Sequence, residues 1–136
     1  MVHALSEVRR VLRPGGLLID LRPTARNRQV ELELAEARLR IGEIDASNSA
    51  TEKLQADEAL QAALDEGLFT AEHRARFEYI TDLDTQEDLR EFAAGLRRSV
   101  MPEGLPRRIA ALTAGVREDY LIRIRREMII WRLRRL

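Results

Sequence analysis

Cysteine, long apolar runs and a signal sequence are missing from this 136-residue sequence, and each absence excludes a class of site or location. Without cysteine the chain forms no disulfide, thiol nucleophile or thiolate metal site. No apolar run approaches the about 20 residues that a membrane-spanning helix needs, and no secretory pattern opens the sequence. These absences predict a cytoplasmic protein that has no membrane partner.

Lysine is nearly missing as well, since Lys53 is the single lysine among 23 basic residues and the others are arginine. A guanidinium binds phosphate or carboxylate through two hydrogen bonds, so the bias is compatible with anion recognition. A codon bias toward GC-rich triplets, with many surface ion pairs, explains it more simply, because 23 acidic residues balance the charge. A chain of zero net charge has no global field that attracts nucleic acid or anionic membranes.

Two patterns that often mark sites do not predict one in this sequence. His3 and His73 are far apart and lack the His-Glu-x-x-His spacing of metal ligands, so we expect no metal site. Alternation sends the C-terminal arginines to both faces of a strand, and Trp131 suits a core position better than base stacking. We therefore do not expect nucleic-acid binding by these arginines, which are Arg123, Arg125, Arg126, Arg132, Arg134 and Arg135.

The best-ordered stretch lies near the start of the sequence. Apolar residues from Leu5 to Leu12 recur at helical spacing, which predicts a short amphipathic helix. Pro14 cannot continue this helix, and the two glycines after it supply the free backbone angles of a tight turn. Residues 17–21 are then an almost unbroken apolar strand, of the kind that is buried on both faces of an α/β sheet.

The segment ALSEVRRVLRPGGLLIDLRP, residues 4–23, resembles the region before and through the fifth strand of class I S-adenosylmethionine-dependent methyltransferases (type 11/25-like). There an amphipathic helix is followed by R-V-L-x-P-G-G and an apolar strand. In that family the segment lies well past the middle, whereas here it begins at residue 4. The resemblance therefore implies the C-terminal portion of such an enzyme, without its N-terminal cofactor-binding half: a truncated product, or the substrate-side piece of a split enzyme.

Residues 29–44 have two interpretations. They alternate strictly on either side of residues 35–37, as the two strands of a hairpin do, but they also fit a helical stripe. We favour the hairpin and keep the helix as the alternative. Either would form part of an insertion over residues 23–74, which also holds a helix over residues 50–66 with Gly67 as its C-cap.

The rest of the sequence predicts two strands and two helices. Residues 76–83 alternate like a half-buried edge strand. Thr85 and Asp88 form a capping box that opens a helix, and Pro106 suits the first turn of another. Residues 120–134 carry apolar side chains in two opposite phases that overlap at residues 128–131, which predicts a central strand covered on both faces, with a bulge as one explanation.

The order of these elements resembles the back half of the methyltransferase fold, whose sheet order is 3-2-1-4-5-7-6. Residues 17–21 then match strand five, residues 76–83 strand six and residues 120–134 strand seven. These strands are neighbours in the order 5-7-6, with the last strand central and antiparallel. We therefore expect one α/β domain over residues 1–136: a partial Rossmann-like methyltransferase sheet with flanking helices and an inserted hairpin or helix.

The resemblance implies S-adenosylmethionine for complete relatives, but not for this chain. Gly15 and Gly16 precede a strand, whereas a nucleotide-binding loop follows one, so we assign no cofactor-binding and no catalytic residues. Asp20 and Arg22 end a strand where α/β folds place ligands, and they are the substrate-cleft candidates. The alternative is that they cap the strand and pair with each other or with a helix.

Without strand four, one edge of residues 17–21 exposes a row of unpaired backbone donors and acceptors. We expect this edge to pair with a second copy in a homodimer, with a separate N-terminal half, or with residues 29–44. Two functions follow. The chain is a methyltransferase-like protein that is not catalytic alone, or it is a non-catalytic homo-oligomeric assembly module.

Overall fold

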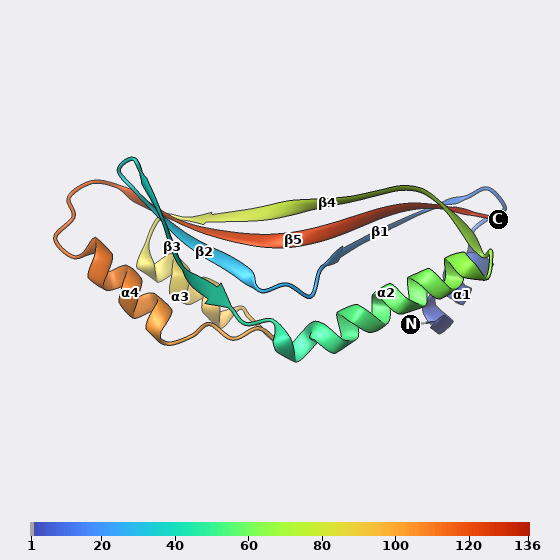
Figure 1. Ribbon diagram of the computed structural model, residues 1–136, viewed down its shortest axis with the longest axis horizontal. Helices are drawn as coiled ribbons and strands as arrows, with labels where there is room; N and C mark the ends of the chain where they lie inside the picture. The colour runs from blue at the N-terminus through green and yellow to red at the C-terminus, as the bar shows by residue number, and fades with distance from the viewer. Residues whose placement is uncertain (1) are drawn as a thin grey trace. The chain divides into compact units, whose positions relative to one another are not determined.

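The computed structural model describes residues 2–136, which form four α-helices, five strands and a short 3₁₀ turn (Figure 1). The predicted α/β class is therefore confirmed. No helix in this described range combines the length and apolar character needed to cross a membrane. In chain order the elements are α1 (Val2–Val11), β1 (Leu17–Pro23), β2 (Arg28–Leu34), β3 (Ala37–Ile44), the 3₁₀ turn (Ser47–Ser49), α2 (Ala50–Asp65), β4 (Phe69–Leu83), α3 (Gln86–Ala94), α4 (Gly104–Thr113) and β5 (Tyr120–Arg135).

The last strand, β5, is the central strand of the sheet. Its residues 128–134 pair antiparallel with β1, its residues 120–125 pair antiparallel with β2, and β4 also pairs with β5. The prediction that the last strand lies between residues 17–21 and 76–83 is thus confirmed, as is its antiparallel direction relative to β1. The resemblance did not predict the direct pairing of β2 with β5.

The hairpin interpretation of residues 29–44 is confirmed, because β2 and β3 pair antiparallel from Arg28–Ile44 to Leu34–Ala37. Ala35 in the turn has a φ of 52°, a left-handed conformation that glycine adopts at lower cost. The expectation that this segment pairs with the free edge of residues 17–21 is wrong. β2 instead lies between β5 and β3, so β1 keeps one edge with which no strand of residues 2–136 pairs.

The described chain divides into two compact units. Unit 1 holds the residues up to Ala25 together with Ala50–Phe77 and Glu127–Leu136, and unit 2 holds Arg26–Ser49 and Glu78–Arg126. The long strands β4 and β5 each contribute residues to both units. The two phases predicted for β5 correspond to this division, because Ile124 is buried in unit 2 and Leu133 is buried in unit 1.

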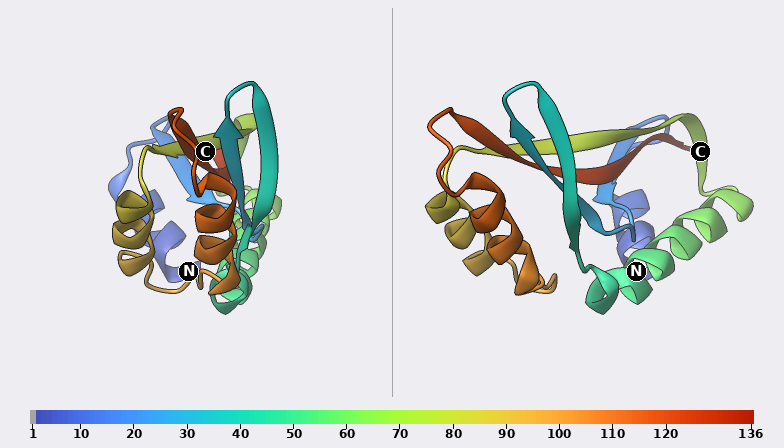
Figure 2. Two further views of the ribbon diagram at one scale, coloured as in Figure 1. Left: turned by 90° about the vertical axis from the view of Figure 1, so that its left-hand side faces the viewer. Right: turned by 60° about the vertical axis from the view of Figure 1, so that its left-hand side comes forward.

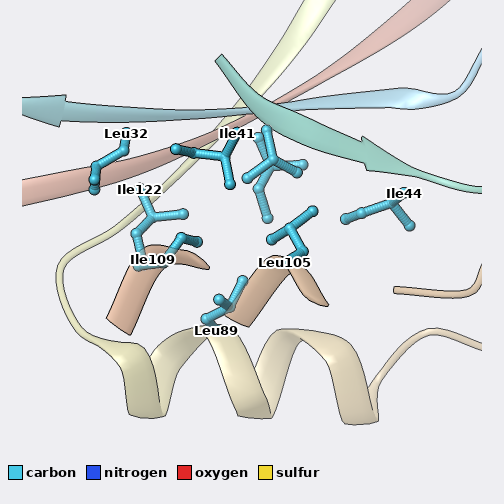
Figure 3. Packing of buried hydrophobic residues seen from close by; sticks show 9 residues of the cluster. Leu32, Ile41, Ile44, Leu89, Leu105, Ile109 and Ile122 are labelled. Atoms are coloured by element: carbon cyan, nitrogen blue, oxygen red, sulfur yellow. The ribbon is translucent and has the colours of Figure 1, made fainter. Parts of the chain in front are cut away.

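Unit 2 consists of the β2–β3 hairpin, parts of β4 and β5, and helices α3 and α4, which are followed most easily in the right-hand view of Figure 2. Leu105 and Ile109 point from α4 toward the strands, and Leu89 reaches the same cluster from α3 (Figure 3). The capping box at Thr85 and Asp88 is confirmed and begins α3. The buried residues of this core are Val30, Leu32, Ile41, Ile44, Leu89, Leu105, Ile109, Ile122 and Ile124.

Unit 1 packs α1 and α2 against β1 and the adjoining parts of β4 and β5. Its buried cluster is Leu60, Ala63, Phe69 and Leu133, which the apolar face of α1 also contacts. Gly67 has a φ of 70° after α2, as expected for a C-cap glycine. In the turn before β1, the amide of Gly15 donates to the Arg135 carbonyl, which fastens the turn to the end of β5.

Burial on both faces was predicted for residues 17–21 and 120–134, and this is wrong for both strands. Alternate residues of β1 are exposed, and on β5 the face opposite Ile122 and Ile124 carries arginines. Helices cover one face of the strands in each unit, and the opposite face is largely exposed, with ion pairs between arginines of β5 and acidic residues on part of it. β4 is also longer and less buried than the predicted half-buried strand, because Phe77 and Tyr79 are exposed.

Arginines of β5 in unit 2 form ion pairs with acidic residues of both neighbouring strands. Each guanidinium lies between a carboxylate of β4 and one of β2, so opposite charges alternate across three strands. This arrangement agrees with the interpretation of the arginine bias as surface ion pairing. The pairs and their N–O distances are Arg123–Asp82 at 2.8 Å, Arg123–Glu33 at 3.5 Å, Arg125–Glu78 at 2.8 Å and Arg125–Glu31 at 3.2 Å.

Asp82→Asn is expected to remove part of the acid sensitivity of folding. Hydrogen bonds from Arg123 lower the pKa of Asp82, and burial opposes this effect only in part. A lowered pKa in the folded state stabilises the fold above the unfolded pKa of about 3.9 and loses this effect as pH falls through the folded pKa. Urea unfolding should therefore show wild type more stable at pH 7 by less than about 1 kcal/mol, as for exposed pairs.

The difference between wild type and Asp82→Asn should shrink as pH falls below the unfolded pKa of about 3.9 and disappear once the carboxyl is protonated in the folded state as well. Asp84→Asn is the matched control, because Asp84 is exposed and forms no ion pair within residues 2–136. An equal loss of stability at pH 7 and pH 2 in Asp82→Asn would show that the ion pair is not its cause.

Candidate functional site

The predicted site residues Asp20 and Arg22 lie on one face of β1, and the structure brings them together. The Arg22 Nε atom donates to Asp20 Oδ2 at 2.6 Å, and Nη1 donates to Asp57 Oδ1 on α2 at 2.8 Å. The side chains of Arg22, Asp20 and Asp57 are 17%, 24% and 53% exposed. The pair lies near the end of the strand, as a substrate-cleft position requires. Its two members also pair with each other and with helix α2, as the alternative interpretation expected.

The charge of Arg22 is held in place by its two carboxylate partners. Burial alone would lower the pKa of Arg22, but the hydrogen bonds and negative charges of Asp20 and Asp57 outweigh this effect and raise it. The remaining nitrogen, Nη2, is buried and has no hydrogen-bond partner within the described chain. The group is therefore a fixed cation whose buried Nη2 carries two N–H groups without a partner in the described chain, and it is not suited to accepting a proton.

The free edge of β1 is the second feature of unit 1 that bears on function. Leu17, Ile19 and Leu21 lie on the same face of the strand and are 43%, 55% and 52% exposed. On its other edge β1 is fully paired with β5, so the unpaired edge and the exposed apolar row belong to one element. An apolar edge strand of this kind is a template for pairing with another strand.

Most of the C-terminal arginines considered for nucleic-acid contact are ion-paired in the structure. In unit 1 the Glu72 carboxylate contacts both Arg132, at 2.9 Å, and Arg134. Arg135 donates to the Leu12 carbonyl, and Arg123 and Arg125 are paired in unit 2. These arginines therefore do not form a free cationic surface. Arg126 is the exception in this cluster, because neither a hydrogen bond nor an ion pair involves it in the described chain.

The histidines and acidic residues provide no metal site in the part of the chain that the structure describes. His3 and His73 are both exposed. Within residues 2–136, no group of three or more histidine, cysteine, aspartate or glutamate side chains is arranged to hold a metal ion. The features that bear on function are thus the cluster of Arg22 with its two carboxylates and the unpaired edge of β1.

Sequence reasoning missed two residues that the fold adds to these features. Asp57 lies 35 positions after Arg22, and only the packing of α2 beside β1 brings the two together. Arg28 begins β2 in the same alternating row as Val30 and Leu32, so its position follows from the hairpin register. The signal for Arg28 was available once the hairpin was assumed, because every second residue of a strand shares a face.

Comparison with models of protein families, with curated proteins and with solved structures gave no match for this chain.

Proposed function

We propose that this chain is a methyltransferase-like protein that supplies the substrate-side half of a class I S-adenosylmethionine-dependent enzyme and does not transfer methyl groups alone. The observation that carries the proposal is the local order β1-β5-β4, with β5 antiparallel to β1 and one edge of β1 free. This is the order that the resemblance assigns to strands five, seven and six. The free edge is the place at which the family has strand four.

In this proposal the glycine turn of this chain does not bind the cofactor. The Gly15 amide donates to the Arg135 carbonyl and the Gly16 amide donates to the Arg13 carbonyl at 2.8 Å, so neither is free to bind a ligand. The turn also precedes β1, whereas nucleotide loops follow a strand and open a helix. S-adenosylmethionine therefore does not fit this turn, and the proposal gives cofactor binding to the partner half.

Asp20 and Arg22 are the residues of this chain that we place toward the substrate. Their side chains are held by each other and by Asp57, so the free Arg22 Nη2 donor has a fixed direction. In this proposal a substrate acceptor reaches the buried Nη2 only after neighbouring side chains move, and it then meets a donor of fixed direction that takes no part in proton transfer.

The alternative function, a homo-oligomeric assembly module, is favoured by one observation. Leu17, Ile19 and Leu21 form an exposed apolar row along the unpaired edge. Two copies related by a two-fold axis would pair their β1 edges antiparallel, and the two apolar rows would then lie side by side on one face of the joined sheet. In this alternative the sheet is used for assembly and no methyl acceptor is bound.

Calorimetric titration of the purified chain with S-adenosylmethionine tests the main proposal. We expect no binding heat, because the chain contributes only the substrate side. Binding with a micromolar dissociation constant would refute the assignment of the cofactor to a partner half.

Ile19→Lys is expected to abolish self-association through β1, because a charged side chain on an edge strand opposes pairing. Light scattering after size exclusion should find the wild type dimeric and the variant monomeric if the assembly module is correct. Ile80→Lys is the matched control, since Ile80 is an exposed isoleucine on β4. A dimer that survives Ile19→Lys but not Ile80→Lys would place the interface on β4 instead of β1. A wild-type monomer in which the amides of residues 17–21 that point away from β5 exchange rapidly would contradict pairing between copies.

A further inference from the structure

Two arginines face each other at one end of the core of unit 2. On β2, Arg28 continues the inward row of Val30 and Leu32, and on β5, Arg126 continues the inward row that contains Ile124. The pairing of β2 with β5 ends at Gln29 opposite Arg125, and Arg28 and Arg126 are the next residues along this register, close enough for the charge of Arg126 to act on Arg28. Like charges directly opposite on neighbouring strands destabilise a sheet, so this placement needs a compensating interaction.

No acidic side chain compensates these two arginines within residues 2–136. The guanidinium of Arg28 stacks over the ring of Phe92, with its carbon 5.5 Å from the ring centroid, and its Nη1 atom is buried without a hydrogen-bond partner. Burial and the charge of Arg126 both lower the pKa of Arg28, and burial lowers the pKa of Arg126. Both groups remain cations at neutral pH, because the ordinary pKa of arginine lies far above neutral pH.

The neighbouring arginines of β5 differ from Arg126 in having acidic partners. Arg123 and Arg125 alternate to the opposite face of the strand, and each is paired there with two carboxylates. Arg126 follows directly in the sequence but faces inward, where it meets a second cation. The chain therefore neutralises its outward arginines and leaves two positive charges facing one space.

That space is a pocket of about 80 Å³ that lies entirely within unit 2. The hydroxyl-bearing residues Tyr79 and Thr81 border it from β4, and Phe92 borders it from α3. A pocket of this volume exceeds the about 30 Å³ share of one water molecule, so it accepts a group of several atoms. The full lining is Arg28, Tyr79, Thr81, Phe92, Ile124 and Arg126.

We propose that this pocket binds a phosphate group between Arg28 and Arg126. Planar guanidinium groups bind phosphate oxygens through pairs of charge-assisted hydrogen bonds, and a hydroxyl of Tyr79 or Thr81 offers a further donor. A phosphate carries about −1.5 to −2 charges at pH 7, which matches the two cations. A carboxylate carries one negative charge and leaves one arginine uncompensated. The inference goes beyond the proposed function and does not depend on it.

The phosphate group belongs either to inorganic phosphate or to a small phosphomonoester. The aromatic rings of Tyr79 and Phe92 at the pocket favour the ester, because they offer apolar surface to the group attached to the phosphate. Inorganic phosphate and phenyl phosphate are therefore the two probes, with acetate as the singly charged comparison.

Calorimetric titration of the full chain with each probe, in chloride buffer of constant ionic strength, tests the proposal. We expect phosphate and phenyl phosphate to bind, acetate to bind at least about tenfold more weakly, and phosphate affinity to fall below pH 6 as the dianion is protonated. Arg126→Met and Arg28→Met keep the aliphatic stem and should each weaken phosphate binding about tenfold or more. Arg107→Gln is the control, because Arg107 is exposed on α4 in the same unit and should bind phosphate like the wild type.

Thermal unfolding of the same proteins separates loss of the site from loss of the fold. In chloride alone the two Arg→Met variants should unfold at or above the wild-type temperature, since each removes one of two half-buried like charges. Added phosphate should raise the unfolding temperature of the wild type and of Arg107→Gln only. Tighter binding of phenyl phosphate than of phosphate identifies the ester as the natural source, and equal binding identifies the free ion. Absence of phosphate binding by the wild type, or equal binding by Arg126→Met, would overturn the proposal.

Discussion

Ile109→Ala is expected to lower the free energy of unfolding by about 2–5 kcal/mol, the usual cost of truncating a fully buried aliphatic side chain. Ile109 is 0% exposed, belongs to the unit 2 core and points from α4 toward the strands (Figure 3). The substitution removes three carbon atoms where no solvent can replace them, and the cavity adds to the lost transfer energy. Urea unfolding followed by circular dichroism measures the change.

Leu112→Ala provides the matched control for this substitution. Leu112 lies on the same helix and is 36% exposed, so its truncation loses less buried surface and leaves no closed cavity. We expect Leu112→Ala to cost less than half as much as Ile109→Ala. Equal costs at the two positions would contradict the packing of α4 described above, because they would mean that the helix does not distinguish its two faces.

Gly16→Ala is expected to destabilise the fold by about 1–3 kcal/mol, the range for forcing extra atoms into a packed place. A Cβ atom at Gly16 would lie 2.8 Å from the carbonyl oxygen of Arg13, and a backbone oxygen cannot move aside as a flexible side chain can. Gly15→Ala should also destabilise, by about 1–2 kcal/mol and for another reason, because Gly15 has a left-handed φ of 75° with open space around it.

Gly104→Ala is the control for both glycine substitutions. Gly104 begins α4, and an added Cβ would meet no atom within 4 Å, so alanine should be neutral or slightly stabilising there. The comparison is made by thermal or urea unfolding under one set of conditions. If Gly16→Ala were as stable as Gly104→Ala, the turn between α1 and β1 would have to differ from the structure described here.

These glycines also illustrate which parts of the fold the sequence predicts. Pro14, Gly15 and Gly16 each act through local backbone geometry, and Thr85 and Asp88 act through a cap three residues long. The elements bounded by such signals were predicted correctly. Local signals operate within one turn of the chain, so one sequence suffices to recognise them.

Burial and side-chain pairing were predicted less well, because they depend on which elements meet. An apolar run such as residues 17–21 has the same composition whether one or both faces are covered, so the exposure of Ile19 was not visible in it. The contact of Arg22 with Asp57 depends on where α2 packs. The position of Arg28 opposite Arg126 depends on a register between strands that lie far apart in the sequence.

The pairing of β1 with β5 has a consequence for how the protein folds while it is being synthesised. Leu17 is matched with Arg134, so β1 finds its partner in a strand that is synthesised more than a hundred residues later. Until β5 emerges from the ribosome, both edges of β1 and its leucine and isoleucine side chains are open to other chains. Closing so distant a pair is also slow, because the loop entropy is lost before the contacts form. Nascent chains of this protein should therefore depend on chaperone protection in proportion to the time that β5 takes to arrive.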